Sequence, residues 1–352
     1  MRYMLGLALL LMPTVAQARD AYHFPAPGGE QQVLTIEASV DITAMEPLIR
    51  DFQALEPTIT IDFADSLTND VFAAAAAACD AQRTYADLFI TSSSDHVVKL
   101  ANDGCAQRYE SSAVQALPEW ANWRNEAIGF SFEPAVIVYN KALVPEADVP
   151  HSHGALIELM RAKPEVYDGR IGTYNIAQSG IGFLFAFFDA EQSSTFGRLL
   201  EGLGRARAVL RCCTGEILTE IESGKLLIGY NLLGSYAYGR VMAGADIGIV
   251  LPSDYTLVLS RAAMIPTRAA NPEAGRLFLD YLISARGQRV AAEKSFFFAF
   301  DRPPPKDVIS AHGGEDASFY RPITIGPSLL ATLDRAKRER FLAEWNAAMG
   351  QQ

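Results

Sequence analysis

The stretch Gly129-Phe-Ser-Phe-Glu-Pro-Ala-Val-Ile-Val-Tyr-Asn140 decides the fold. It is a continuous apolar strand, entered through Pro134, and it lies between two halves of the chain that are built alike. A second strand-like stretch, residues 256–265, precedes Pro266. We therefore expect the chain to cross twice between two lobes.

The residues before this stretch alternate between strand and helix patterns. The helical segment at 42–55 places its apolar side chains on one face, and the strand segments are short and apolar. The predicted strands and helices, taken in order, are 33–38, 42–55, 58–63, 71–78, 88–91 and 96–102. Such an alternation is typical of a parallel sheet with helices on its faces.

The same alternation restarts after the crossing stretch, with strands and helices at 170–173, 181–188, 208–210, 216–223 and 226–231. Two series of this kind predict an α/β protein with two lobes, each a mostly parallel sheet flanked by helices, joined by two crossing strands. We place the first lobe at 30–135 with a return at 252–300, and the second lobe at 141–250. A C-terminal helical segment, 301–352, is expected to pack on the second lobe.

The first 18 residues have the layout of a secretory signal peptide. Arg2 gives a positive start, residues 4–15 are apolar, and Ala16-Gln17-Ala18 is a small-residue cleavage pattern. The first cysteine is Cys79, so no lipid-attachment position follows the cleavage site. We expect a protein released into a Gram-negative periplasm and not anchored as a lipoprotein.

The charge balance excludes nucleic acid as a partner. The sequence has 30 Lys and Arg against 41 Asp and Glu, a net charge of −11, and loss of Arg2 with the signal leaves 29 − 41 = −12. A phosphate backbone would repel such a chain. The periplasm also offers no ATP or nicotinamide, and the chain has neither a Ser-His-Asp order nor an HExxH motif. Neither an enzymatic activity nor a cofactor is expected.

Four cysteines suit an oxidising compartment, although they are too few for a disulfide scaffold in a chain of this length. Cys79 and Cys105 could pair within the first lobe. Cys212 and Cys213 are adjacent, and they could form a vicinal disulfide, remain as thiols or bind a soft metal ion. A metal site needs further ligands at suitable spacing, and no metal is expected here.

Small hydroxyl and glycine residues gather at the predicted strand ends of both lobes. In open parallel sheets ligands lie beyond the carboxyl ends of the strands, and free amides at helix starts favour anions. Each cluster alone is ordinary capping chemistry, but their number predicts a shared cleft for a small anion. The candidate ligand-binding residues are Ser39, Thr43, Ser92, Ser93, Ser94, Ser179, Gly180, Ile181, Gly182, Thr214, Asn231, Ser235 and Tyr236.

Three segments, in this order and spacing, resemble the type 2 periplasmic solute-binding proteins of ABC importers. They are Glu133-Pro-Ala-Val-Ile-Val-Tyr-Asn140, Ser223-Gly-Lys-Leu-Leu-Ile-Gly-Tyr-Asn231 and Phe278-Leu-Asp-Tyr-Leu-Ile-Ser-Ala-Arg-Gly-Gln288. The branch it resembles includes ferric-ion binders, hexose-phosphate binders and phosphoglycerate-type transport regulators. The resemblance implies a monomer with the type 2 binding-protein fold, which closes on a solute and delivers it to an inner-membrane permease.

Two alternatives stay open within this resemblance. Ferric-ion binders of the branch use tyrosines, often adjacent, whereas this chain has Tyr236 and Tyr238 separated by one residue. An organic or phosphorylated anion is therefore expected ahead of ferric iron. The regulatory relatives imply that a sensor kinase could replace the permease as the partner.

Overall fold

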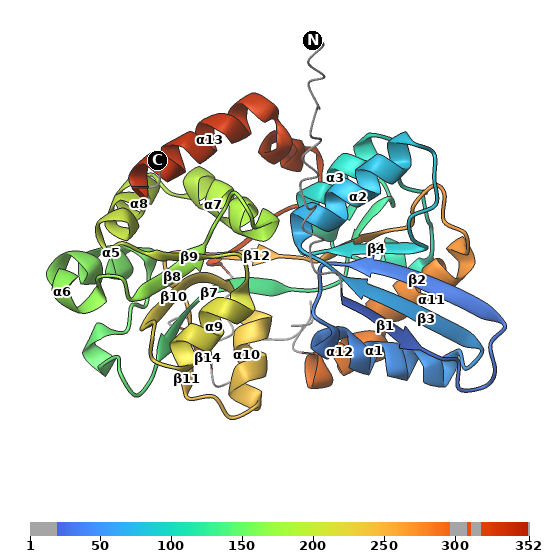
Figure 1. The fold of residues 1–352 in the computed structure, drawn as a ribbon, viewed down its shortest axis with the longest axis horizontal. Helices are drawn as coiled ribbons and strands as arrows, with labels where there is room; N and C mark the ends of the chain where they lie inside the picture. Colours follow the sequence, from blue (N-terminus) through green and yellow to red (C-terminus); the bar gives the residue numbers. More distant parts are fainter. Residues whose placement is uncertain (1–19, 296–307, 311–317, 351–352) are drawn as a thin grey trace, which may run out of the picture.

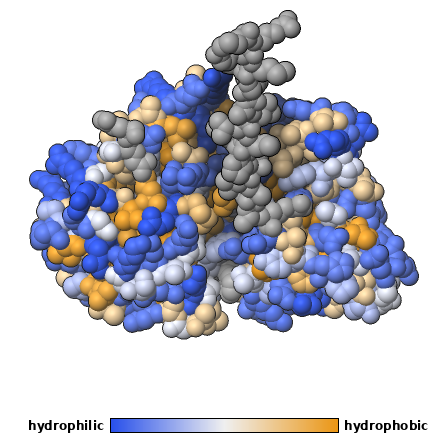
Figure 2. Space-filling model, in the orientation of Figure 1, coloured by the Kyte–Doolittle hydropathy of each residue, from blue (hydrophilic) through white to orange (hydrophobic). Residues whose placement is uncertain are grey.

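The computed structural model describes residues 20–295, 308–310 and 318–350, and it consists of two lobes, each built around one sheet (Figure 1). The predicted signal peptide and the segment 301–307 lie outside the described residues. On the face drawn in Figure 2, hydrophilic residues cover most of both lobes, hydrophobic residues form scattered patches, and an indentation separates the lobes at the lower edge. Among the described residues no helix has the length and apolar character needed to cross a membrane.

The first lobe contains a seven-stranded sheet in the order β1-β3-β2-β4-β13-β6-β5. These strands are β1 (Asp20–Phe24), β3 (Ile59–Asp65), β2 (Gln32–Ala38), β4 (Leu88–Thr91), β13 (Ala262–Met264), β6 (Ala127–Gly129) and β5 (Asn122–Trp123). One face carries α1 (Ile42–Leu55), α11 (Pro272–Ile283) and α12 (Ala285–Lys294). The other face carries α2 (Thr68–Asp80) and α3 (Ser94–Asn102).

The second lobe contains an eight-stranded sheet whose main path is β14-β11-β7-β10-β8-β9, with β12 and β15 beside it. These strands are β14 (Val308–Ser310), β11 (Ile247–Leu251), β7 (Glu133–Asn140), β10 (Ile228–Leu233), β8 (Ile171–Tyr174), β9 (Val209–Arg211), β12 (Thr256–Leu259) and β15 (Tyr320–Pro322). The main helices are α5 (His153–Ala162), α7 (Gly180–Gln192), α8 (Phe196–Arg205), α9 (Thr214–Glu222) and α10 (Gly234–Met242).

Strand β7 is buried along its whole length. Successive side chains of a strand point to opposite faces of the sheet. Val136 and Val138 accordingly belong to the cluster that includes residues of α9 and α10, whereas Ile137 and Tyr139 pack with α5 and α8. Burial on both sides explains why this strand has no polar face.

Both sheets are mixed: among the described strands, parallel pairs outnumber antiparallel ones in the second lobe, as predicted, but not in the first. In the first lobe only the β3-β2-β4 part is parallel, and the pairs β1/β3, β4/β13, β13/β6 and β6/β5 are antiparallel. In the second lobe β7 runs antiparallel to β10, β11 and β12. The strands next to the two connections between the sheets run opposite to the strands of the βα units beside them. This topology produces the antiparallel pairs.

The chain passes between the sheets through two short connections, from β6 to β7 and from β12 to β13. Arg261 and Glu133 lie at these connections and are 1% and 0% exposed. Their bidentate pair joins Nε to Oε1 at 2.5 Å and Nη2 to Oε2 at 3.2 Å. The hydroxyl of Ser131 donates to Glu133 Oε1 and accepts from the backbone amide of Arg261, so it supports the carboxylate and fixes the backbone beside the guanidinium.

The C-terminal segment contacts both lobes. Helix α13 (Arg335–Ala348) packs on the second lobe, where Phe341 meets Phe183 and Phe187 of α7. The 3-10 segment η3 (Pro327–Leu333) packs on α3 of the first lobe, and Thr332 donates to the carboxylate of Asp95 at 2.8 Å. The C-terminal segment therefore contains both a 3-10 element and an α-helix, and α13 begins after its N-cap, Asp334.

Candidate functional site

A cavity of about 240 Å³ lies between the lobes, where the carboxyl ends of several strands meet. Both lobes and the β12–β13 connection contribute to it. Its lining residues are Asp20, Ser39, Val40, Asp41, Asp65, Ser66, Leu67, Thr68, Ser92, Gln178, Ser179, Ile181, Cys212, Cys213, Thr214, Gly215, Leu233, Tyr236 and Arg261. The cavity therefore occupies the place where an α/β fold puts its ligands.

Hydroxyls at the ends of β2 and β4 form one part of the first-lobe wall. Ser39 donates from its hydroxyl to Thr91 Oγ1 at 2.9 Å and accepts from the amide of Ser92 at 3.3 Å. Ser92 lines the cavity and is only 4% exposed. Within the described residues its own hydroxyl has no hydrogen-bond partner. A buried hydroxyl in this state is available to a bound molecule.

Three carboxylates form the other part of the first-lobe wall. Asp20 and Asp65 face each other directly across the antiparallel pair β1/β3, and Asp41 is the N-cap residue of α1. Burial, and after it the charges of Asp41 and Asp20, raise the pKa of Asp65 to about 7, although Arg261 opposes the shift. This acidic wall, Asp20, Asp41 and Asp65, is the strongest electrostatic feature of the cavity.

Arg261 and Tyr236 close the base of the cavity. The guanidinium of Arg261 lies 5.2 Å from the ring centre of Tyr236, a cation–π distance. Glu133, which does not line the cavity, forms an ion pair with this guanidinium and also accepts a hydrogen bond from Ser235. Burial raises the pKa of Tyr236, so its phenol stays protonated. The one arginine of the cavity therefore has its charge already balanced.

The second-lobe wall consists of the starts of α7 and α9. Ser179 caps α7 by accepting from the amide of Gly182 at 3.2 Å. Helix α9 begins at Thr214 with Cys213 as its N-cap residue, and no side chain caps it. The hydroxyls of Thr214 and Tyr174 lie 2.5 Å apart. An uncapped helix start leaves amide donors and a partial positive charge facing the cavity.

Direct hydrogen bonds hold the lobes together beside the cavity. The amide of Gly180 donates to Thr68 Oγ1 at 2.9 Å, and the side-chain amide of Asn69 donates to the carbonyl of Gln178 at 2.8 Å. The amide of Asp41 donates to the phenol oxygen of Tyr236 at 3.3 Å. These contacts join α1 and α2 of one lobe to α7 and α10 of the other.

The cavity gathers Ser39, Ser92, Ser179, Ile181, Thr214 and Tyr236 from the predicted set. The other predicted residues do not line it: Thr43, Ser93, Ser94, Gly180, Gly182, Asn231 and Ser235. Gly180 and Ser93 lie instead at the interface of the lobes, where a Cβ on Gly180 would come within 2.4 Å of Ser93 Oγ. Gly182 lies against Tyr174, and its amide is already occupied by the cap. Two amides at the start of α7 are therefore already occupied, that of Gly182 by Ser179 and that of Gly180 by Thr68.

Asn231 has a structural role. Its side chain donates to the carboxylate of Asp189 at 2.6 Å, and that carboxylate also accepts from Tyr230 at 2.6 Å and Tyr255 at 3.0 Å. Asp189 is completely buried, and burial raises its pKa. This network lies within the second lobe and explains a polar residue at the carboxyl end of a buried strand without any ligand.

Sequence reasoning missed the acidic wall and Arg261. Asp41 and Asp65 each stand at the end of a predicted strand or at the start of the following helix, which is where ligand-binding residues are expected. The positions of Asp41 and Asp65 in the sequence could therefore have identified them. An expected anionic ligand favours hydroxyl and glycine residues over carboxylates, so these two were not among the candidates. Asp20 carried no signal, because β1 lies in a segment that has no strand pattern.

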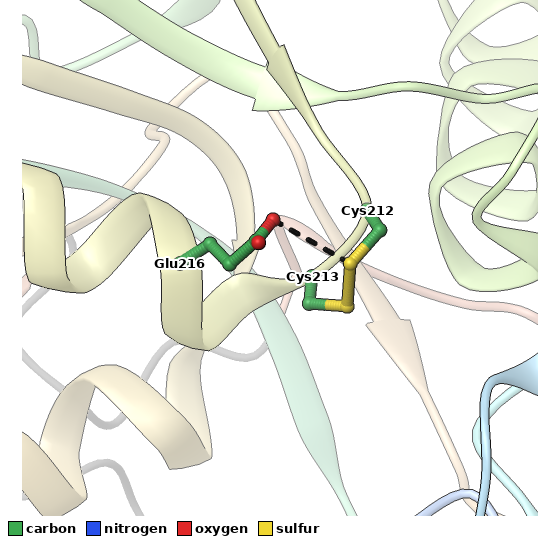
Figure 3. A group of neighbouring side chains, drawn as sticks. All are labelled: Cys212, Cys213 and Glu216. Carbon is green, nitrogen blue, oxygen red and sulfur yellow. Dashed lines mark hydrogen bonds between the residues drawn. A yellow bond between two sulfur atoms is a disulfide. The ribbon is translucent and has the colours of Figure 1, made fainter. Parts of the chain in front are cut away.

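All four cysteines are oxidised in the structure. Cys79 and Cys105 join the end of α2 to the segment after α3, and Cys212 and Cys213 form a vicinal disulfide on the cavity wall. Figure 3 shows this disulfide beside Glu216, whose carboxylate lies 3.5 Å from Cys212 Sγ. An oxidised sulfur has no hydrogen to donate and is not a thiolate metal ligand, so only the reduced pair could bind a soft metal ion.

The chain matches one family model, described as bacterial extracellular solute-binding protein, over residues 35–297. The substrate-binding protein of an ABC transporter from Agrobacterium tumefaciens is 34% identical in sequence. The alignment covers 95% of this chain and 99% of that one, with a TM-score of 0.88. Comparison with the curated proteins finds no match.

More distant structures share the fold. Iron-bound HitA from Pseudomonas aeruginosa is 17% identical, with a TM-score of 0.70 and coverage of 90% of this chain and 99% of that one. AfuA from Actinobacillus pleuropneumoniae, with fructose-6-phosphate bound, is 15% identical, with a TM-score of 0.73 and coverage of 92% and 100%. The two-lobed α/β architecture expected from the sequence is thereby confirmed.

Proposed function

The chain belongs to the bacterial extracellular solute-binding proteins of the ABC transporter family, and from this premise we propose that it closes on a small organic anion in the cavity between its lobes. After closure it delivers the solute to an inner-membrane permease. The protein works as a monomer in the periplasm, which it reaches through the cleavable signal at residues 1–18.

One observation supports this proposal: the cavity is shared between the two lobes, and it lies beside the short connections through which the chain crosses from one sheet to the other. Its walls come from both sheets, and hydrogen bonds such as Gly180 to Thr68 link the lobes at its edge. Two lobes joined by two short connections form a hinge, so closure can trap a solute and opening can release it.

The uncapped start of α9 is the place for the anionic group. The amides of its first turn lack a side-chain cap, and Thr214 and Gly215 line the cavity. A carboxylate or phosphate there would accept hydrogen bonds and complement the helix dipole. The helix has nine residues, enough to present a developed dipole at its N-terminus.

Ferric iron is less well supported. Tyr236 faces the cavity, but burial raises the pKa of its phenol, whereas hard Fe(III) needs anionic oxygen ligands. Tyr238 is not among the lining residues. Among the His, Cys, Asp and Glu side chains of the described residues, only Cys212, Cys213 and Glu216 form a group of three or more close enough to share one metal ion, and the two cysteines are joined in a disulfide.

The test is a thermal-shift screen of ligand-stripped mature protein, beginning at Arg19. The panel contains phosphorylated sugars, phosphoglycerates, di- and tricarboxylates and ferric citrate. A ligand at 100 times its dissociation constant should add about 2.7 kcal/mol of stability. Small-angle scattering with each hit should show a more compact protein. Absence of any shift and any compaction across the panel would contradict the proposal.

A pair of glycine variants locates the binding. An added Cβ meets no atom within 4 Å at Gly215, which lines the cavity, or at Gly197, which is in α8 and does not. Gly215→Tyr should fill the cavity and abolish the ligand-induced shift, whereas Gly197→Tyr should keep it. Equal retention by both variants would show that the solute binds elsewhere.

A further inference from the structure

We propose that the solute also carries a positively charged nitrogen, which binds at the acidic wall formed by Asp20, Asp41 and Asp65. This inference rests on the proposed function and specifies its solute as a small zwitterion. The anionic group faces the start of α9 in the second lobe, and the ammonium or related cation faces the first lobe.

Within the described residues, the acidic wall is not paired with any cationic side chain. Among the described residues no Lys, Arg or His forms an ion pair with Asp20, Asp41 or Asp65. The single basic residue of the cavity, Arg261, makes its bidentate pair with Glu133. The lining therefore holds three acidic residues and one arginine that is already neutralised, which opposes a solute carrying only negative charge.

The placement of two of these carboxylates is unfavourable without a ligand. Asp20 and Asp65 occupy directly opposite positions on antiparallel strands, where like charges destabilise a sheet. Burial is the largest cause of the raised pKa of Asp65, about 7, and the charges of Asp41 and then Asp20 add to it, while Arg261 opposes them. Perturbed carboxyl groups in a cleft are typical of functional sites, and a cation placed between them would relieve the repulsion.

The geometry favours an organic cation over a bare metal ion. The three carboxylates do not belong to any described group whose ligand atoms all lie within 4.8 Å of one another. Oxygens that far apart cannot share one inner coordination sphere, since Ca²⁺ and Mg²⁺ hold oxygens at about 2.0 to 2.6 Å. An ammonium group, with several N–H donors pointing in different directions, can bridge carboxylates that are more widely separated.

A second, independent observation indicates a bound molecule at this wall. Ser92 is 4% exposed and lines the cavity, and its hydroxyl has no partner among the described residues. The Ser92 hydroxyl oxygen is not fully buried, so it can form a hydrogen bond with a molecule held in the cavity. A polar solute between Asp65 and the start of α9 would supply the missing partner.

The test uses pairs of compounds that differ only in an amino group. The pairs are phosphoethanolamine and ethyl phosphate, taurine and ethanesulfonate, and 4-aminobutyrate and butyrate. Thermal shifts and calorimetric affinities are measured for each compound with the ligand-stripped protein. We expect at least one aminated compound to bind at least tenfold more tightly than its amine-free counterpart.

Charge-removing variants connect that preference to the wall. Asp41→Asn and Asp65→Asn should each weaken the aminated compound about tenfold and leave the amine-free compound unchanged or slightly tighter. Asp62→Asn is the matched control, because Asp62 lies on the same strand β3 with an exposed side chain outside the cavity. Retention of the preference in both wall variants would overturn the inference.

The remaining outcomes separate this inference from the proposed function. If an amine-free anion of either panel binds as tightly as every aminated compound, the zwitterion is wrong and solute binding stands. If no aminated compound binds but a phosphorylated sugar or a carboxylate does, the zwitterion inference is again wrong, and the proposed function of solute binding stands. If nothing in either panel binds, both the inference and the proposed function are contradicted.

Discussion

Replacement of Asp65 by Asn should make the ligand-free protein more resistant to unfolding, and increasingly so as the pH rises. Burial and the neighbouring Asp41 and Asp20 raise the pKa of Asp65 from 3.8 to about 7 in the folded state, while Arg261 opposes the shift. The folded protein therefore holds this proton more tightly than the unfolded chain does. Stability from the bound proton is complete below pH 4 and is lost as the pH rises through 7.

The magnitude follows from the interval between the two pKa values. Each pH unit within it removes about 1.4 kcal/mol for a complete proton, so the loss from pH 5 to pH 7 would reach about 3 kcal/mol. Solvent screening at this partly exposed carboxyl reduces the expected loss to about 2 kcal/mol. The Asn side chain does not titrate, and the stability of Asp65→Asn relative to the wild type should increase by that amount.

The assay is urea unfolding of the ligand-stripped wild type, Asp65→Asn and the control Asp62→Asn at pH 5, 6, 7 and 8. The difference between wild type and Asp65→Asn should grow between pH 5 and 7 and level off near pH 8. For Asp62→Asn, the difference in stability from the wild type should not grow between pH 5 and 7 through a proton held by a buried carboxyl group. The carboxylate of Asp62 is exposed beside His23. A difference independent of pH, or a variant that is less stable at pH 8, would refute the reasoning.

Two further predictions concern covalent and ionic links. Replacing Cys79 and Cys105 by Ser opens a loop with a sequence separation of 26 and should cost about 3 kcal/mol in denaturant unfolding. The Cys212 and Cys213 double Ser variant closes no such loop and should cost less than about 1 kcal/mol, and equal losses would refute the loop argument. Glu133→Gln leaves a buried guanidinium without its counter-charge and should lower stability by about 3 kcal/mol, measured in the same way. A loss below about 1 kcal/mol would show that the pair is not desolvated.

The sequence determined the local elements and their general arrangement. Strand β4 and helix α1 have the bounds expected from apolar periodicity, because short apolar runs and one-sided helical faces are local signals. The continuous apolar run at 129–140 predicted the strand that is now β7, and Ser39, Ser92 and Thr214, chosen as polar residues at strand ends, line the cavity. These features depend on neighbours in the chain or on the general rule for sheet edges.

Only the tertiary structure decided which of those polar groups stay free. Asn231 had the right position for a ligand, but folding places it against Asp189, and the start of α7 receives its cap from Ser179 and a bond from Thr68 of the other lobe. The acidic wall depends on a strand register that places Asp20 opposite Asp65, residues 45 positions apart, as 65 − 20 shows. Hydrogen-bond satisfaction and electrostatic repulsion depend on distances in space, and a local sequence pattern does not contain those distances.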